Sequence, residues 1–149
     1  MRSRLRAYAL PMAAIGTIAA IAGATVVIPE GEAVLEGLYP AQDAVYARYL
    51  DGGAARLKKY VFGGLKDVPL PFDGSFGVIV TDPLMPGAFV GLESWVAPST
   101  IYQVSPAGDL SETPLVTKPA IDVSGFTSER LFATAKDGTQ VPVSIVYKK

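Results

Sequence analysis

The chain has 149 residues, half of them hydrophobic, and it contains neither cysteine nor histidine. This length allows one domain, or one small domain with an appendage, and the apolar content argues against intrinsic disorder. The composition excludes disulfides and thiolate metal sites, and it removes the usual proton acceptor of a serine or cysteine nucleophile. We therefore predict no catalytic, cofactor-binding or metal-binding residues in this chain, and no cofactor.

Charge is unevenly distributed along the chain. Arg2, Arg4 and Arg6 carry three of the thirteen positive charges, so residues 7–149 have a formal net charge of −4. The other basic pairs are Lys58-Lys59 and Lys148-Lys149, which we interpret as solvated strand ends. Because affinity for nucleic acid depends largely on clustered Lys and Arg, we do not expect nucleic-acid binding.

Residues 1–28 form a segment of their own, with a basic start, an apolar and helix-like middle, and small residues around Ala22. This pattern is typical of a secretory signal peptide, and the apolar stretch is nearly long enough to anchor the chain in a bilayer. A soluble core segment or a wrongly assigned start codon would fit it equally. A signal peptide makes the product exported or periplasmic; otherwise we expect a cytoplasmic protein. Membrane contact is expected only if residues 7–28 are retained.

From Ala33 onward the pattern predicts short β-strands separated by Gly and Pro turns. In a first unit, residues 33–70, apolar runs precede and follow Asp51-Gly52-Gly53. We expect a tight hairpin turn there, because glycine accepts the positive φ angles that such turns need. The return strand is expected to end at Gly63-Gly64.

A second unit, residues 76–118, repeats the order of strand and turn. Laid over the first at a shift of 44 residues, it places Ala88 on Ala44 and Ile101 on Leu57. A period near 44 with about four strands per repeat is typical of propeller blades. We therefore predict an all-β chain with about two blades of a β-propeller, each a four-stranded antiparallel sheet. A single antiparallel sandwich of seven or eight strands is the alternative.

The last thirty residues differ from both units. An irregular passage from Lys118 to Phe126 is followed by two apolar runs that flank Lys136-Asp137-Gly138-Thr139. Asp-Gly between two such runs is the strongest short-range hairpin signal. The chain stops directly after this hairpin, which suggests a second domain that is begun and not completed.

This order of elements resembles the prolyl oligopeptidase family of serine peptidases, at the junction between propeller and hydrolase domain. Residues 126–149, FTSERLFATAKDGTQVPVSIVYKK, are similar to the start of the family's α/β-hydrolase domain. Residues 93–102 look like its final blade, and residues 28–35 like the opening of its penultimate blade. The resemblance implies a partial propeller over residues 29–118, then a linker and the opening hairpin of a truncated hydrolase domain over residues 119–149.

The family cleaves short peptides after proline with a Ser-Asp-His triad, and its propeller limits access to the active site. The family's serine lies on a G-x-S-x-G elbow, which this sequence lacks, as it lacks histidine. The resemblance thus implies a non-catalytic propeller fragment of a serine-type endopeptidase, inactive alone. Its partners would be the remainder of the propeller and the hydrolase domain, with peptide substrate bound only by the complete enzyme. The alternative is a free-standing exported β-domain that binds a peptide or protein partner.

Several polar and aromatic residues have a structural explanation beside a functional one. Glu30 and Glu32 would share one side of an extended segment, but the neighbouring Gly and Pro favour a solvated turn. Trp95, Tyr102 and Phe126 could line a ligand site, but at strand spacing we expect core or blade-packing residues. Turn formation explains five aspartates, each beside Gly or Pro: Asp51, Asp73, Asp82, Asp109 and Asp137.

Overall fold

A computed structural model describes residues 26–149, in which all regular structure is β-strand. The prediction of an all-β chain is confirmed. The signal-peptide or anchor prediction falls almost entirely on residues 1–25, outside the described residues. Within residues 26–149, no helix is long and apolar enough to cross a membrane.

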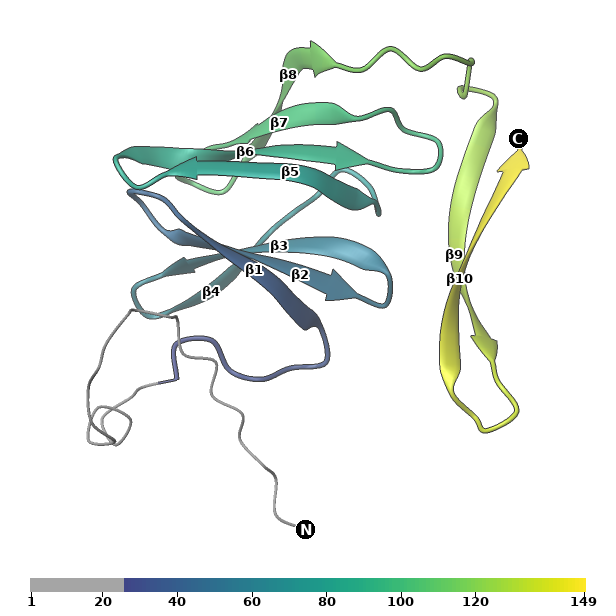
Figure 1. The fold of residues 1–149 in the computed structure, drawn as a ribbon, viewed down its shortest axis with the longest axis horizontal. Helices are drawn as coiled ribbons and strands as arrows, with labels where there is room; N and C mark the ends of the chain where they lie inside the picture. Colours follow the sequence, from purple (N-terminus) through teal and green to yellow (C-terminus); the bar gives the residue numbers. More distant parts are fainter. Residues whose placement is uncertain (1–25) are drawn as a thin grey trace, which may run out of the picture. The chain divides into compact units, whose positions relative to one another are not determined.

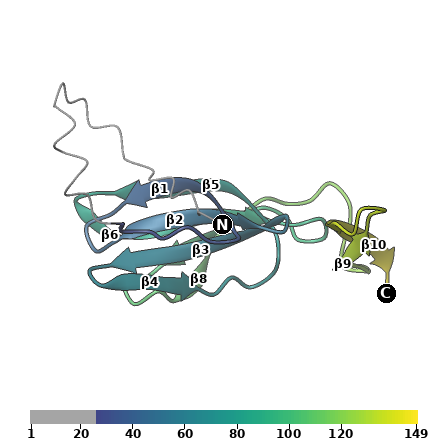
Figure 2. The same cartoon turned by 90° about the horizontal axis from the view of Figure 1, so that it is seen from below.

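The first sheet has four antiparallel strands that are hydrogen-bonded in chain order (Figures 1 and 2). Its strands are β1 (Val34–Pro40), β2 (Val45–Asp51), β3 (Ala54–Val61) and β4 (Gly64–Val68). Between β2 and β3 the turn is tight, and Gly52 and Gly53 have φ angles of 52° and 86°. Two consecutive positive φ angles are what a two-residue hairpin loop requires, as predicted. Gly63, with φ of 104°, forms the next turn, so the chain continues into β4 directly from Gly64.

The second sheet repeats this arrangement, again with four antiparallel strands in chain order (Figure 1). Its strands are β5 (Ser75–Asp82), β6 (Met85–Glu93), β7 (Thr100–Val104) and β8 (Leu110–Val116). The register between β5 and β6 shifts at two places, between Phe76 and Val78 and between Val80 and Asp82. Two successive four-stranded meanders confirm the prediction of blade-like sheets.

The two sheets share one hydrophobic core. The first sheet contributes Tyr46, Ala55, Leu57 and Val68, and the second contributes Phe76, Ala88, Val90, Leu92 and Val104. Tyr46, Val90, Leu92 and Val104 have no exposed surface. Along β3 the buried side chains alternate with half-buried ones, because successive residues of a strand point to opposite faces. The core therefore lies between the facing surfaces of two stacked sheets.

A two-stranded antiparallel hairpin follows, made of β9 (Phe126–Thr134) and β10 (Gln140–Lys148). Its strands pair without a shift from Phe126–Lys148 to Thr134–Gln140 (Figure 1). At the predicted turn, Gly138 has a φ of 86°, and the Thr139 amide donates a hydrogen bond of 3.0 Å to the Asp137 carboxylate. The hairpin signal in the sequence is thus confirmed.

The aromatic residues singled out above do not all lie in a core. Trp95 is 73% exposed in the loop between β6 and β7, and Phe126 is 41% exposed at the start of β9. Tyr102 is partly buried and packs against the shared core. The expectation of core packing is confirmed for Tyr102 and is wrong for Trp95 and Phe126, which are exposed in the described chain.

Candidate functional site

The most deeply buried charges of the described chain form an ion pair. The Lys59 ammonium lies 2.6 Å from the Asp43 carboxylate, and their side chains are only 6% and 15% exposed. Lys59 comes from the middle of β3, and Asp43 from the loop between β1 and β2. The Tyr46 hydroxyl donates a hydrogen bond of 3.3 Å to the same carboxylate oxygen, and the Lys59 ammonium lies 5.8 Å from the centre of the Tyr46 ring.

Each charge of this pair also reaches the second sheet. The Gly87 amide at the start of β6 donates a hydrogen bond of 2.7 Å to the other Asp43 oxygen. The Lys59 ammonium donates to the carbonyl oxygen of Pro106, in the turn between β7 and β8. We call Asp43, Lys59, Gly87 and Pro106 the polar junction. It connects the two sheets beside their shared core.

The electrostatics of the polar junction favour charged Asp43. Burial pushes the pKa of Asp43 upward, but the hydrogen bonds from Lys59 and Gly87 and the Lys59 charge outweigh it, so the pKa lies below its ordinary value of 3.8. Burial, together with the Asp43 charge, raises the pKa of Tyr46. At neutral pH Asp43 is therefore a carboxylate and the neighbouring Tyr46 a neutral phenol, and both are already hydrogen-bonded. Such an arrangement positions the backbone; it does not leave an acid or base free to act on a substrate.

The interpretation of Lys58-Lys59 as a solvated strand end is wrong for Lys59. Both residues lie inside β3, where Ala55, Leu57 and Lys59 alternate as buried residues. Lys58 points to the other face and pairs with exposed Asp67 at 3.3 Å. Period-two alternation from Ala55 would have placed Lys59 on the core face. The sequence does not indicate, however, that the Asp43 carboxylate lies beside it.

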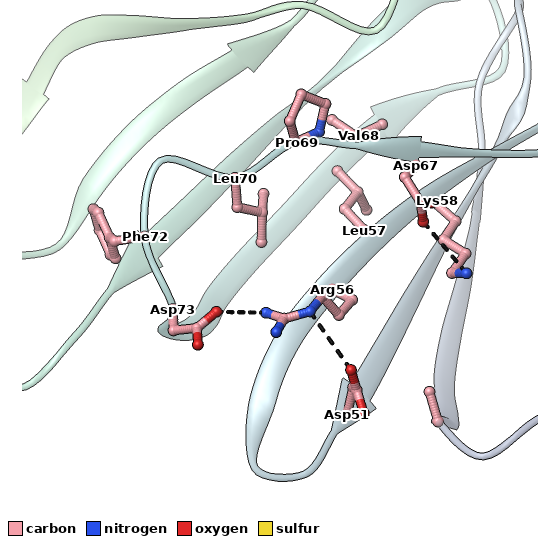
Figure 3. A pocket seen from close by; sticks show the side chains of 11 residues that line it. Asp51, Arg56, Leu57, Lys58, Asp67, Val68, Pro69, Leu70, Phe72 and Asp73 are labelled. Atoms are coloured by element: carbon pink, nitrogen blue, oxygen red, sulfur yellow. Dashed lines mark hydrogen bonds and ion pairs between the residues drawn. The ribbon is translucent and has the colours of Figure 1, made fainter. Parts of the chain in front are cut away.

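A second group of charges lines a shallow pocket of about 440 Å³ at the edge of the first sheet (Figure 3). Arg56 of β3 reaches Asp73 at 2.7 Å and Asp51 at 3.7 Å, and Leu70 and Phe72 form part of the apolar wall. Both aspartates were predicted as turn residues. The structure gives them a further role as partners of Arg56.

Arg130 of β9 extends this charge network. Its guanidinium donates a hydrogen bond of 3.2 Å to the Asp51 carbonyl oxygen and lies 3.9 Å from the Asp73 carboxylate. A Cβ atom added at Gly52 would lie 3.7 Å from the Phe132 ring. Asp51 and Asp73 at the pocket are therefore paired with arginines, and Arg130 brings β9 into contact with the turn before β3.

The remaining polar candidates behave as turn or surface residues. Glu30 and Glu32 lie exposed in a segment without regular structure. The Asp82 carboxylate accepts a hydrogen bond of 2.8 Å from the Leu84 amide, which closes the turn between β5 and β6. In residues 26–149, no three Asp or Glu side chains gather closely enough to hold a metal ion. The expectation that no catalytic residue lies in this chain stays a prediction.

Comparison with known proteins identifies relatives of this chain. No family model matches the chain. A prolyl endopeptidase of Dictyostelium discoideum is 31% identical over 132 residues, which cover 83% of this chain. A prolyl endopeptidase of Elizabethkingia miricola is 26% identical over 106 residues, or 70% of the chain. The chain is related to the prolyl oligopeptidase family.

Solved structures of prolyl oligopeptidases have the same fold in this segment. A prolyl endopeptidase structure superimposes on 83% of the chain with a TM-score of 0.70 at 24% identity. Prolyl oligopeptidase B of Galerina marginata superimposes on 82% with a TM-score of 0.70 at 22% identity. The chain spans only 17% and 15% of the length of the two prolyl endopeptidases matched in sequence. The similarity thus concerns one segment of these proteins.

Proposed function

We propose that this chain is a non-catalytic, propeller-side part of a prolyl-oligopeptidase-type serine endopeptidase. The observation that carries the proposal is the order of two four-stranded meanders and one hairpin, which aligns with prolyl endopeptidases over 83% of the chain in sequence and in fold. The proposed reaction, peptide cleavage after proline, is inferred from the relatives, which are prolyl endopeptidases. The residues of this chain would form part of the scaffold of such an enzyme. The polar junction and the apolar core give that scaffold two blades fixed to each other.

In this proposal residues 29–118 contribute two blades, and residues 119–149 lead into the hydrolase domain through β9 and β10. The blades would cover the active site of the complete enzyme and limit access to short peptides. A peptide substrate would be bound by the complete molecule and cleaved after proline by residues that this chain does not contain. Partners of this segment are then the other blades and the rest of the hydrolase domain.

The mass of the native protein tests this proposal. An antibody raised against residues 126–149 would be used on extract of the source cells, with the free peptide as competitor. We expect a competed band several times heavier than the 15.6 kDa of this chain, and an immunoprecipitate that hydrolyses a chromogenic peptide after proline. A single competed band at or below 15.6 kDa, without hydrolysis in the immunoprecipitate, would refute the proposal and favour a free-standing binding domain.

A further inference from the structure

We infer that the ion pair of Asp43 and Lys59 sets the register in which the first sheet packs on the second. This inference concerns the assembly of the two sheets and does not depend on any peptidase activity. It rests on the polar junction, in which Lys59 is 6% and Asp43 15% exposed and both charges have partners from both sheets.

The geometry makes each charge a link between the sheets. Asp43 uses one oxygen for Lys59 at 2.6 Å and the other for the Gly87 amide at 2.7 Å. Lys59 uses its ammonium for Asp43 and for the Pro106 carbonyl oxygen. A displacement of either sheet by one residue would break the contacts to Gly87 and Pro106. It would leave a largely buried carboxylate and ammonium between the sheets without these partners.

The apolar part of the interface does not impose such a constraint. Contacts among Leu57, Val90 and Val104 are non-directional, so several packing arrangements could bury a similar area. Charge-assisted hydrogen bonds are short and directional, and an uncompensated buried charge is strongly unfavourable. A buried ion pair often contributes little net stability compared with apolar residues of similar size, and in some proteins such pairs specify one packing arrangement.

Gly87 supports the same conclusion. It has a φ of 88°, and a Cβ atom at this position would lie 2.5 Å from the Val104 carbonyl oxygen. Glycine is therefore required where the backbone turns its amide toward Asp43. Next to it, the Gln42 amide donates a hydrogen bond of 3.1 Å to the Met85 carbonyl oxygen. This backbone bond between the sheets involves no side chain, so substitution of Asp43 or Lys59 removes neither of its atoms, and the bond reports the register.

The test is a double-mutant cycle on the full 149-residue chain with Asp43→Asn, Lys59→Met and both together. The readouts are the melting temperature and the hydrogen exchange of the Gln42 amide, divided by that of amides in the ladder between β2 and β3. This ratio separates loss of register from general destabilisation. The matched control cycle uses Lys58→Met and Asp67→Asn, which remove an exposed pair from the opposite face of the same strand.

We expect both single substitutions to lower the melting temperature more than their controls do. The double variant should melt higher than Lys59→Met, yet its normalised Gln42 exchange should be at least about tenfold faster than in wild type. Normalised exchange within about twofold of wild type in the double variant would overturn the inference. If Lys59→Met does not fold, the normalised exchange of the Gln42 amide is compared between Asp43→Asn and wild type instead. In Asp43→Asn the side-chain amide oxygen can still accept a hydrogen bond from Gly87, while the charge pair is lost.

Discussion

Asp43 carries a negative charge that the surrounding residues stabilise, and this has a consequence for acid stability. Its pKa lies below 3.8 in the folded chain, so the carboxylate stabilises the fold above the pKa of the unfolded state and loses that contribution as the pH falls through the folded pKa. We expect Asp43→Asn to lower the free energy of unfolding by about 1–3 kcal/mol at neutral pH.

This difference between wild type and Asp43→Asn should be constant from about pH 7 to pH 5 and should shrink as the pH falls below about 4, because Asp43 of the unfolded chain then binds a proton more readily than Asp43 of the folded chain. Urea unfolding at a series of pH values measures it. Asp67→Asn serves as control, because Asp67 is 81% exposed beside Lys58. A difference that grew with acidification would contradict the assigned direction of the pKa shift.

Gly87 is a second position at which a single residue matters. Replacement by Ala places a side chain in a left-handed conformation and against the Val104 carbonyl oxygen. We expect Gly87→Ala to destabilise the chain by at least about 1–2 kcal/mol. Gly64→Ala is the control, since a Cβ atom there meets no other atom and the φ angle is not positive. Denaturant unfolding measures both, and equal effects would show that position 87 tolerates a side chain.

Prediction from sequence at the scale of single residues succeeded where local geometry decides the outcome. Asp51-Gly52-Gly53 and Asp137-Gly138 form turns because their backbone angles suit glycine, whatever the rest of the chain does. The environment of Lys59 depends instead on Asp43, sixteen positions away, and on Pro106 in the other sheet. The residues next to Lys59 in the sequence do not indicate these distant partners, so the sequence analysis did not predict the polar junction.

At the scale of elements, β9 is connected to the first sheet through Arg130. Its guanidinium meets the Asp51 carbonyl oxygen and the Asp73 carboxylate, and its side chain is 20% exposed. Ion pairs near the surface contribute little and are weakened by salt. We expect Arg130→Gln to lower the free energy of unfolding by less than about 1 kcal/mol at low ionic strength.

The same substitution should have no measurable effect in about 1 M NaCl, where charges are screened over a few ångströms. Thermal unfolding at low and high salt measures this, with Lys136→Gln at an exposed turn position as the control. The central carbon of the Arg130 guanidinium lies 5.9 Å from the centre of the Phe132 ring. An effect of Arg130→Gln that persisted in high salt would show that the guanidinium acts through packing on this ring instead of through its charge.

The division into two sheets was predictable at this scale because each sheet is a meander. Strands joined by short turns pair with their sequence neighbours, so strand order follows from the turns alone. The two register shifts in the pairing of β5 with β6 were not predicted, since the alternation of apolar residues does not indicate where an extra residue enters one strand. The charge network at Arg56 was also missed, because Asp73 lies beyond β4 in the linker.

At the scale of the whole molecule, both faces of the second sheet are apolar. Ile79 and Val90 point into the shared core, whereas Val78, Val80 and Phe89 lie on the opposite face and are 42–53% exposed. A sheet with one side facing water normally alternates apolar and polar residues. Apolar residues on both faces are typical of a sheet between two layers, as an internal blade of a propeller would be.

This exposed face leads to a prediction about the chain when it is expressed alone. Contiguous exposed apolar surface promotes association, so we expect its weight-average mass to rise with concentration in sedimentation or light-scattering measurements. The double variant Val80→Thr/Phe89→Thr should reduce this rise and keep the sheet intact, because threonine suits strands. Phe62→Thr is the control: Phe62 is fully exposed, but it lies in the turn between β3 and β4. A sharp monomer at all concentrations would mean that the outer face of the second sheet needs no covering layer, which would weaken the case for an internal blade.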